Sequence, residues 1–372
     1  MTNLQKFSLF ILILSFSTIF GIPYEFSGML SGWCQYIDNS DDSNTTIFGF
    51  RGIPSLEIPI SSHIQFEAST NLYTSFPPND FQQIKKVTEL KPYRWWIRYS
   101  TDQLEGRIGL QQINFGPCKI LRPLMWFDQL DPKDPLHLTE GIHGIRFRYD
   151  FQNNANIWFW SLYGNKDVKG WEYIPTNKKT PEFGGRIQHP FYNGEFAFTL
   201  HHRKISDNVN QTINEGEENR IALDGIWDIG IGIWLESSTS QFLFQNGSQH
   251  FHSAHSLGMD YTLPIRNGLY ILTEHLYTTN GTELTHQVET FKISGITTTY
   301  PFGIFDQFSF FSFYNWTSSS TIHYVSWQRN LDMLSLYLSG YWNSKDTTLL
   351  ETSSSVEMVG SSGILFMIIY NF

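Results

Sequence analysis

Arginine is the residue type whose spacing in this chain points most clearly to chemistry. Arg94 and Arg98 share one face of the segment PYRWWIRYS if it is a strand, and Arg146 and Arg148 share one face of GIRFRYDF, because strand residues two apart point the same way. A guanidinium group is planar and can donate two hydrogen bonds at once, so it suits carboxylate and phosphate groups. This spacing indicates a surface that could bind or guide anions.

Carboxylates fall on the same face and leave two interpretations open. The arginines and acids can form an interior network of ion pairs, since buried charges are normally paired. Unpaired arginines can instead form a ladder that guides anions, because rings of charge set the selectivity of pores. The two can coexist. The residues expected to line this face are Arg94, Arg98, Glu105, Arg107, Arg146, Arg148, Arg186, Arg203 and Asp224, with Asp150, Glu195, Arg220, Asp228 and Glu236 beside them.

The histidines do not form a catalytic or metal-binding pattern. In HFHSAH, His250 and His252 share a strand face while His255 lies on the other, so three ligands to one metal would require the strand to break. Glu274 and His275 are adjacent and face opposite ways. The chain also has no Gly-x-Ser-x-Gly motif and no phosphate-binding loop. We therefore expect no catalytic residue, no metal and no cofactor.

The elements that must position the arginines are β-strands. Repeated segments of about ten residues alternate polar and apolar positions, which is typical of membrane barrels. Eight short turns alternate with nine generally longer connections, which predicts 18 strands. Sixteen is the alternative, because 285–300 is weakly patterned. The longer connections are expected near 38–45, 74–91, 116–141, 164–182, 205–217, 239–249, 280–288, 317–319 and 343–353.

The predicted fold class is an all-β transmembrane antiparallel barrel, formed by residues 22–372 as a single domain. A secreted β-sandwich or jelly roll is the competing fold, since it would also show alternating strands and turns. The barrel is favoured because a sandwich needs no excess of aromatic residues at its strand ends and no apolar strand at the C-terminus. Within the barrel the charged face must be the lumen, because an arginine at the bilayer midplane costs roughly 2–4 kcal/mol. An even strand number also places both ends of the chain on one side of the membrane.

Both ends of the sequence indicate a membrane protein. Residues 1–21 are expected to be a signal peptide, because Lys6 is followed by an uncharged apolar run to Phe20. The last segment, GILFMIIYNF, places its apolar side chains on one face at period two and reads as a final strand. Tyr370 and Phe372 are expected to be the signal that the barrel insertion machinery recognises.

Composition excludes some partners. Charged residues make up 16% of the chain, against about 25% in soluble proteins, and aromatic residues make up another 16%. The net charge of −10 argues against nucleic acid as a partner. Outer-membrane lipid and a small solute are the expected partners. A disulfide between Cys34 in the first strand and Cys118 in the long loop is left open. The strict geometry of a disulfide and the apolar face on which Cys34 lies count against it.

The connection 116–141 is the longest and the most apolar. Because an exposed apolar loop would be a liability, we expect it to fold into the barrel and narrow the pore, although packing over the rim is the alternative. The residues expected near the constriction are Lys119, Arg122, Trp126 and Asp128.

Residues 105–151 resemble outer-membrane porin-like barrels, including the alginate-export family. The resemblance lies in Arg107, Gly109 and Gln111, in Asn114-Phe115-Gly116, in Trp126-Phe127-Asp128, and in the alternating Arg146 and Arg148. It implies passive passage of solutes across the outer membrane, with no cofactor and no catalytic residue. A structural or docking barrel remains the alternative function, and a barrel enzyme a further one. The sequence alone leaves the solute and the oligomeric state open.

Overall fold

A computed structural model describes residues 23–38, 44–76, 88–130, 134–209, 212–344 and 362–372. The predicted signal peptide lies outside these ranges. The strands are β1 (Glu25–Asp38), β2 (Thr45–Pro59), β3 (Ile64–Phe76), β4 (Glu89–Ser100), β5 (Leu104–Gln111), β6 (Ile142–Asp150), β7 (Asn156–Leu162), β8 (Glu182–Phe191), β9 (Gly194–Val209), β10 (Thr212–Asp228), β11 (Gly232–Phe244), β12 (Gln249–Leu263), β13 (Leu269–Glu283), β14 (His286–Pro301), β15 (Asp306–Asn315), β16 (Ser320–Asn330), β17 (Leu334–Asn343) and β18 (Ser362–Asn371).

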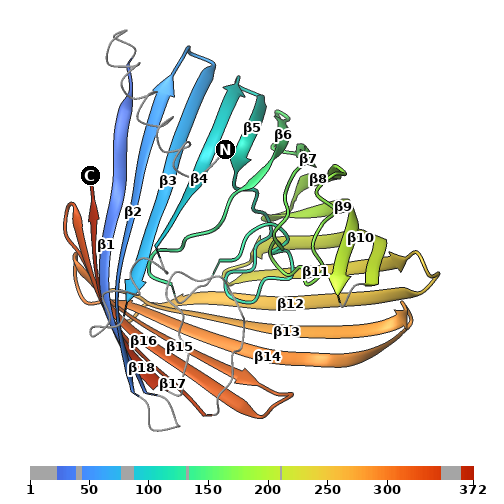
Figure 1. Cartoon of the computed structure of the whole chain (residues 1–372). Helices are drawn as coiled ribbons and strands as arrows, with labels where there is room; N and C mark the ends of the chain where they lie inside the picture. Colours follow the sequence, from blue (N-terminus) through green and yellow to red (C-terminus); the bar gives the residue numbers. More distant parts are fainter. Residues whose placement is uncertain (1–22, 39–43, 77–87, 131–133, 210–211, 345–361) are drawn as a thin grey trace.

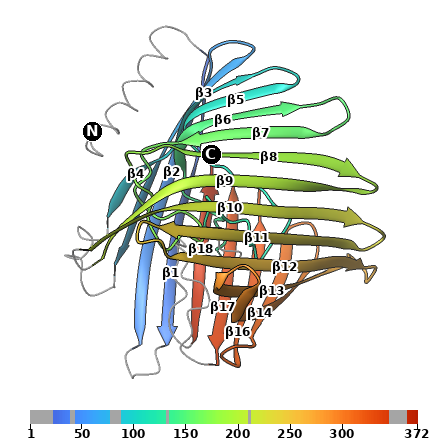
Figure 2. The same cartoon turned by 90° about the vertical axis from the view of Figure 1, so that its right-hand side faces the viewer.

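The eighteen strands close into an antiparallel barrel. Each strand pairs with its neighbours in sequence, and β1 pairs with both β2 and β18. Figures 1 and 2 show the strands surrounding an interior that loops enter. Closure leaves no free sheet edge. The prediction of an 18-stranded barrel is confirmed, and the alternative of 16 strands is wrong.

The connections differ in length between the two ends of the barrel. One end carries short turns, which are 60–63, 101–103, 151–155, 192–193, 229–231, 264–268, 302–305 and 331–333. The other end carries longer connections, and among those that the structure describes the longest are 112–141 and 163–181. We call the first the turn end and the second the loop end. The alternation that the sequence predicts is confirmed, but three loops are shorter than expected.

The shortening affects the predicted loops 205–217, 239–249 and 280–288. In the structure β9 runs to Val209 and β10 starts at Thr212, while the other two connections are reduced to 245–248 and 284–285. The polar composition of these segments resembles loop sequence. They are nevertheless strand, because β9 and β10 pair along this stretch and satisfy their backbone hydrogen bonds.

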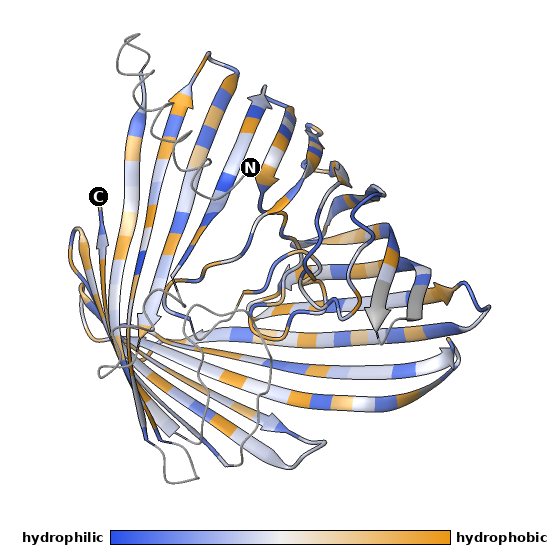
Figure 3. Ribbon diagram, viewed as in Figure 1, coloured by the Kyte–Doolittle hydropathy of each residue, from blue (hydrophilic) through white to orange (hydrophobic). Residues whose placement is uncertain are grey.

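Polar and apolar residues alternate along the strands, as Figure 3 shows. On β4 the side chains of Arg94 and Trp96 are buried inside the barrel, while Ile97 and Tyr99 are exposed on its outside. On β9, Phe196, Phe198 and Leu200 are exposed in the same way. An outer surface of this kind matches a lipid-facing band. Among the residues that the structure describes, no helix is long and apolar enough to cross a bilayer.

The alternation breaks once on β5. Leu110 is expected on the lipid side with Ile108, but it is buried and lines a cavity beside Phe127 and Gln129 of the 112–141 connection. Gly109 has a φ of 127°, and a Cβ there would lie 2.2 Å from the Trp95 carbonyl oxygen. Only glycine fits this conformation and this approach, and the local break redirects the residue that follows.

The final strand β18 is apolar on both faces. Ile364, Phe366, Ile368, Tyr370 and Phe372 are exposed on the outside, as predicted. Leu365, Met367 and Ile369 face inward and are buried with Trp33, and Leu136 of the 112–141 connection packs against them. The inner face is apolar because a loop covers it.

Candidate pore lining and inward loops

The long loop 112–141 folds into the barrel and is fixed there by a carboxylate of the wall. Glu274 on β13 accepts hydrogen bonds from the backbone N–H groups of Lys119, Ile120 and Leu121 at 2.7, 3.0 and 2.5 Å. It also accepts one from the indole of Trp234 at 2.8 Å. A loop without regular structure must find partners for its backbone donors, and here a single buried side chain supplies them.

A second carboxylate, Glu236 on β11, repeats this arrangement. It accepts hydrogen bonds from the backbone N–H groups of Cys118 at 2.8 Å and Leu124 at 2.9 Å. Gly116 permits the approach: its φ is 93°, and a Cβ there would lie 2.3 Å from a carboxylate oxygen of Glu236. Glu236 and Glu274 are buried at the loop, so their role is to hold it. The sequence analysis placed Glu236 in the lumen but did not identify this function.

The apolar residues of the loop form a core inside the barrel wall. Phe115 stacks on Trp160 of β7 with ring centroids 5.6 Å apart, and Trp126 donates a hydrogen bond from its indole to Ser238 Oγ at 3.1 Å. The members of this core are Ile113, Phe115, Leu124, Trp126, Phe127, Ile142, Trp158, Trp160, Leu162 and Ala222. These contacts place the loop inside the barrel, and the narrowing of the pore stays a prediction.

The four residues predicted at the constriction have different environments. Arg122 and Asp128 form a buried ion pair at 2.8 Å, and Trp126 is buried in the core just described. These three side chains face protein rather than water, because the loop binds the wall through them. Lys119 alone is substantially exposed, at 44%, and its ammonium group lies 2.7 Å from Asp260 of β12.

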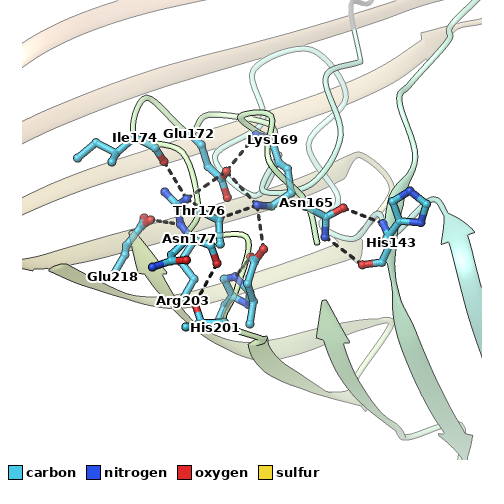
Figure 4. Close-up of polar contacts among 12 residues, drawn as sticks. His143, Asn165, Lys169, Glu172, Ile174, Thr176, Asn177, His201, Arg203 and Glu218 are labelled. Atoms are coloured by element: carbon cyan, nitrogen blue, oxygen red, sulfur yellow. Dashed lines mark hydrogen bonds and ion pairs between the residues drawn. The ribbon is translucent and has the colours of Figure 1, made fainter. Parts of the chain in front are cut away.

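The second long loop, 163–181, is held inside the barrel by a network of buried charges (Figure 4). Lys169 contacts Glu172 and Glu182, each at 3.1 Å, and Arg203 lies 3.2 Å from Glu172. The carboxylate of Glu218 accepts hydrogen bonds from Arg203 and Arg220, and Arg220 also reaches Glu172 at 2.9 Å. Three cations therefore meet three carboxylates, and the burial of these charges is compensated.

His201 completes this network as a neutral group. The indole of Trp160 donates to Nδ1 at 3.2 Å, and Nε2 lies 3.2 Å from Glu182 Oε2. Because Nδ1 must accept, the proton is assigned to Nε2, which donates to the carboxylate. The sequence analysis missed Lys169, Glu172 and Glu182. The inward position of Glu182 on its strand could have identified it as a member of this network. The positions of Lys169 and Glu172 within a loop gave no such signal.

A different group of charges lies on β4, β5 and β6. Arg98 is the cross-strand partner of Arg107, and Arg107 is the partner of Arg146. We call these three residues the arginine row. They share one carboxylate, Glu105, which lies 3.5 Å from Arg107, 3.9 Å from Arg98 and in hydrogen-bond contact with Arg146. Their side chains are 33%, 17% and 11% exposed for Arg98, Arg107 and Arg146, respectively.

The arginine row is under-neutralised by its direct partners. The Nε atom of each of the three guanidinium groups is buried without a hydrogen-bond partner. Arg107 lies over the ring of Trp96, 4.3 Å from its centroid, which stabilises the charge by a cation–π contact. Glu67 of β3 also interacts electrostatically with Arg98 and Arg107, and it faces Glu57 across β2 and β3. The arginine row thus has one carboxylate in direct contact and two further acids on the neighbouring strands.

The other arginines predicted to line the wall each have a hydrogen-bond or ion-pair partner. Arg186 binds Asp224 through two hydrogen bonds of 2.5 and 2.8 Å, and Arg94 donates to the carbonyl oxygen of Thr139 at 2.9 Å. Arg148 pairs with Asp150 at 2.8 Å. Arg94, Arg186, Arg203 and Asp224 are buried beneath the loops, so they do not line open water although they face inward. The interpretation as an interior network of ion pairs describes these residues, and the anion ladder stays a prediction.

Cysteines and histidines add no further site. Cys34 and Cys118 are both free, with Cys34 on the outer face of β1 and Cys118 buried in the loop, so they form no disulfide. Within the described ranges no group of three or more potential ligands could hold a metal. His252 instead contacts Asn280 at 2.7 Å, and His255 contacts Ser237 at 2.8 Å.

Closed barrels of solved outer-membrane proteins have the same fold. OccAB1 of Acinetobacter baumannii superposes with a TM-score of 0.57 at 8% identity, covering 94% of this chain and 96% of that one. OccAB3 of the same organism gives 0.57 at 9% identity, covering 94% and 99%. OmpT of Vibrio cholerae, described as an outer membrane protein in trimer form, gives 0.51 at 9% identity, covering 94% and 99%.

These similarities show that the chain shares the closed β-barrel fold of solved outer-membrane proteins, and its apolar outer surface fits that fold. No protein-family model matches the sequence, and no curated protein matches it. The resemblance of residues 105–151 to alginate-export barrels therefore remains a prediction.

Proposed function

We propose that this protein is an outer-membrane channel for the passive diffusion of small solutes and that its lumen prefers anions. The observation that carries the proposal is the arginine row, in which three guanidinium groups on adjacent strands share the carboxylate of Glu105. A fixed charge acts strongly on an ion only when it is close, because salt screens charges beyond about 10 Å. The row therefore outweighs distant acids in setting selectivity.

The test is the reversal potential of the reconstituted barrel across a salt gradient. We expect anion preference in the wild type. Replacing the arginine row with Arg98→Gln, Arg107→Gln and Arg146→Gln should lower the anion-to-cation permeability ratio at least about threefold, since one unit charge about 7 Å away in water contributes about 0.6 kcal/mol. A cation-selective wild type would contradict the proposal.

A matched control is available on the outside of the wall. The control residues are the ion-paired Lys204, Lys292 and Arg329. They lie on the outer faces of their strands, because their neighbours in sequence face inward. Changing all three to glutamine removes the same number of positive charges without touching the lumen. The permeability ratio should stay within error of the wild type.

A structural or docking barrel is the second candidate. The observation that favours it is the packing of two loops inside the barrel, held by Glu236, Glu274 and the Lys169 network. Single-channel conductance in a planar bilayer separates the two functions, because a barrel that is closed by its loops passes no steady current.

We further propose that passage involves no catalytic step. His201 is committed to Trp160 and Glu182 in the buried network, which leaves it unsuited to act on a solute. A barrel hydrolase would lose activity on His201→Gln or His250→Gln, and assays of ester and peptide substrates with these variants test that alternative.

A further inference from the structure

A cavity of about 270 Å³ lies between the two inward loops and the wall of β11 to β14. Trp171 and Tyr173 of the second loop face it, as do Phe242 of β11, Leu276 of β13 and Phe291 of β14. Phe242 is two residues from the end of β11 at Phe244, so the cavity is near the loop end of the barrel. We call it the outer cavity.

The lining of the outer cavity suits a ring-shaped, apolar molecule. The rings of Tyr173 and Phe242 are 5.2 Å apart at 45°, and Trp126 adds a third aromatic side chain. Aromatic groups pack favourably against such surfaces in tilted and offset arrangements. An apolar cavity of about 150 Å³ already holds benzene, so the outer cavity has room for a substituted ring.

The charges at the outer cavity balance each other. Arg203 and Arg220 form ion pairs of 2.5 to 3.2 Å with Glu172 and Glu218. An ion entering this site would lose its hydration without meeting an unpaired opposite charge. The site therefore selects against charged solutes, in contrast to the arginine row.

We propose that the outer cavity is a binding site for an uncharged ring-containing solute. The aromatic side chains enclose the ring, and the charged side chains of the lining are paired with one another and attract no ion. Binding here does not depend on whether the barrel conducts, so it can be tested separately from the channel function.

The test uses the full-length barrel folded in detergent micelles and fluorine NMR of small probes, with empty micelles as the blank. We expect 4-fluoroacetophenone and 4-fluorotoluene, which are both uncharged, to bind saturably. 4-Fluorobenzoate, which is charged, should bind at least about tenfold more weakly. Probe behaviour identical to that in empty micelles, or tighter binding of the benzoate, would overturn the proposal.

Variants locate the binding. Ala254→Leu fills the outer cavity and Phe242→Ala removes part of its aromatic wall, and each should weaken binding of 4-fluoroacetophenone about tenfold or more. Tyr337→Ala, which removes a lumen aromatic on β17 outside this cavity, should leave binding unchanged. Circular dichroism establishes that each variant is folded. Unchanged binding in both cavity variants would place the probe elsewhere and contradict the proposal.

Discussion

At the scale of single residues, two wall carboxylates perform a task that helices and strands usually perform for themselves. Glu274 accepts three consecutive backbone N–H groups of the 112–141 loop, and Glu236 accepts two more. A carboxylate suits this task because it offers two oxygens and no donor. The loop is thus held by side chains from strands more than a hundred residues away in sequence.

We expect Glu274→Gln to loosen the loop. The amide keeps one acceptor oxygen and places donors opposite backbone donors, which costs about 1–3 kcal/mol in a buried site. Trypsin can cleave after Lys119 only when the loop leaves the wall, so cleavage of the folded barrel at this site should accelerate at least about tenfold. Glu283→Gln on the exposed end of β13 is the control, and equal cleavage rates in the two variants would contradict this role.

Cys118 provides a second residue-scale prediction. Burial, with smaller contributions from Glu236 and Glu274, raises the pKa of its thiol far above the usual range. Because the thiolate is the reactive form, the thiol should stay unreactive toward a water-soluble maleimide at pH 9 in a folded Cys34→Ser variant and react at once after unfolding. Rapid labelling of the folded protein at pH 9 would show that the loop does not shelter Cys118.

At the scale of elements, β18 joins β1 to close the barrel. The backbones of Phe372 and Gly28 exchange hydrogen bonds of 2.9 and 3.0 Å, and the ring of Phe372 lies 5.6 Å from that of Phe26. This residue therefore contributes to closure directly, in addition to its proposed role as an assembly signal with Tyr370.

Ending the chain at Asn371 should reduce the yield of folded barrel. It removes both backbone hydrogen bonds and the aromatic contact with β1, and it alters the segment that we expect the insertion machinery to recognise. The fraction of heat-modifiable, folded protein in isolated outer membranes measures the effect. Phe302→Ala changes an exposed aromatic residue in a connection at the turn end and should leave the yield unchanged.

The elements were predictable from sequence to different degrees. Strand number and the faces of β4, β6 and β9 follow from period-two patterns, which depend only on neighbouring residues. The full extent of β9 and β10 was not predictable from this pattern, because polar residues can continue a paired hairpin as readily as they form a loop. The contacts of Glu182 and Glu274 also escaped prediction, since they depend on how a loop folds back across the barrel.

At the scale of the whole molecule, the lumen is divided into unlike halves. The inward charges concentrate on β4 to β10 in the arginine row and the Lys169 network. The inward faces of β15 to β17 carry aromatic and hydroxyl groups instead, including Phe313, Tyr324, Ser339 and Tyr341. The arginine row on β4 to β6 and the outer cavity against β9 to β14 lie on different stretches of the wall.

The topology leads to a prediction for intact cells. A peptide tag inserted at Asn246, in the connection between β11 and β12 at the loop end, should be reached by antibody from outside. A tag at Asn193, in the turn between β8 and β9, should be reached only after the outer membrane is permeabilised, because short turns of such barrels face the periplasm. The reverse pattern would invert the orientation of the barrel.

The packing of Leu136 against the cluster formed by Trp33 of β1 and the inward residues of β18 bears on the order of folding. Leu136 belongs to a loop in the first half of the chain, whereas β18 is its last strand. The loop can therefore complete its packing only when the final strand has arrived. Contacts between such distant parts of a chain form late and slowly. In an assembly intermediate that lacks β18, the loop would be incompletely packed. We therefore expect closure of the barrel and packing of the loop to occur together in one cooperative step.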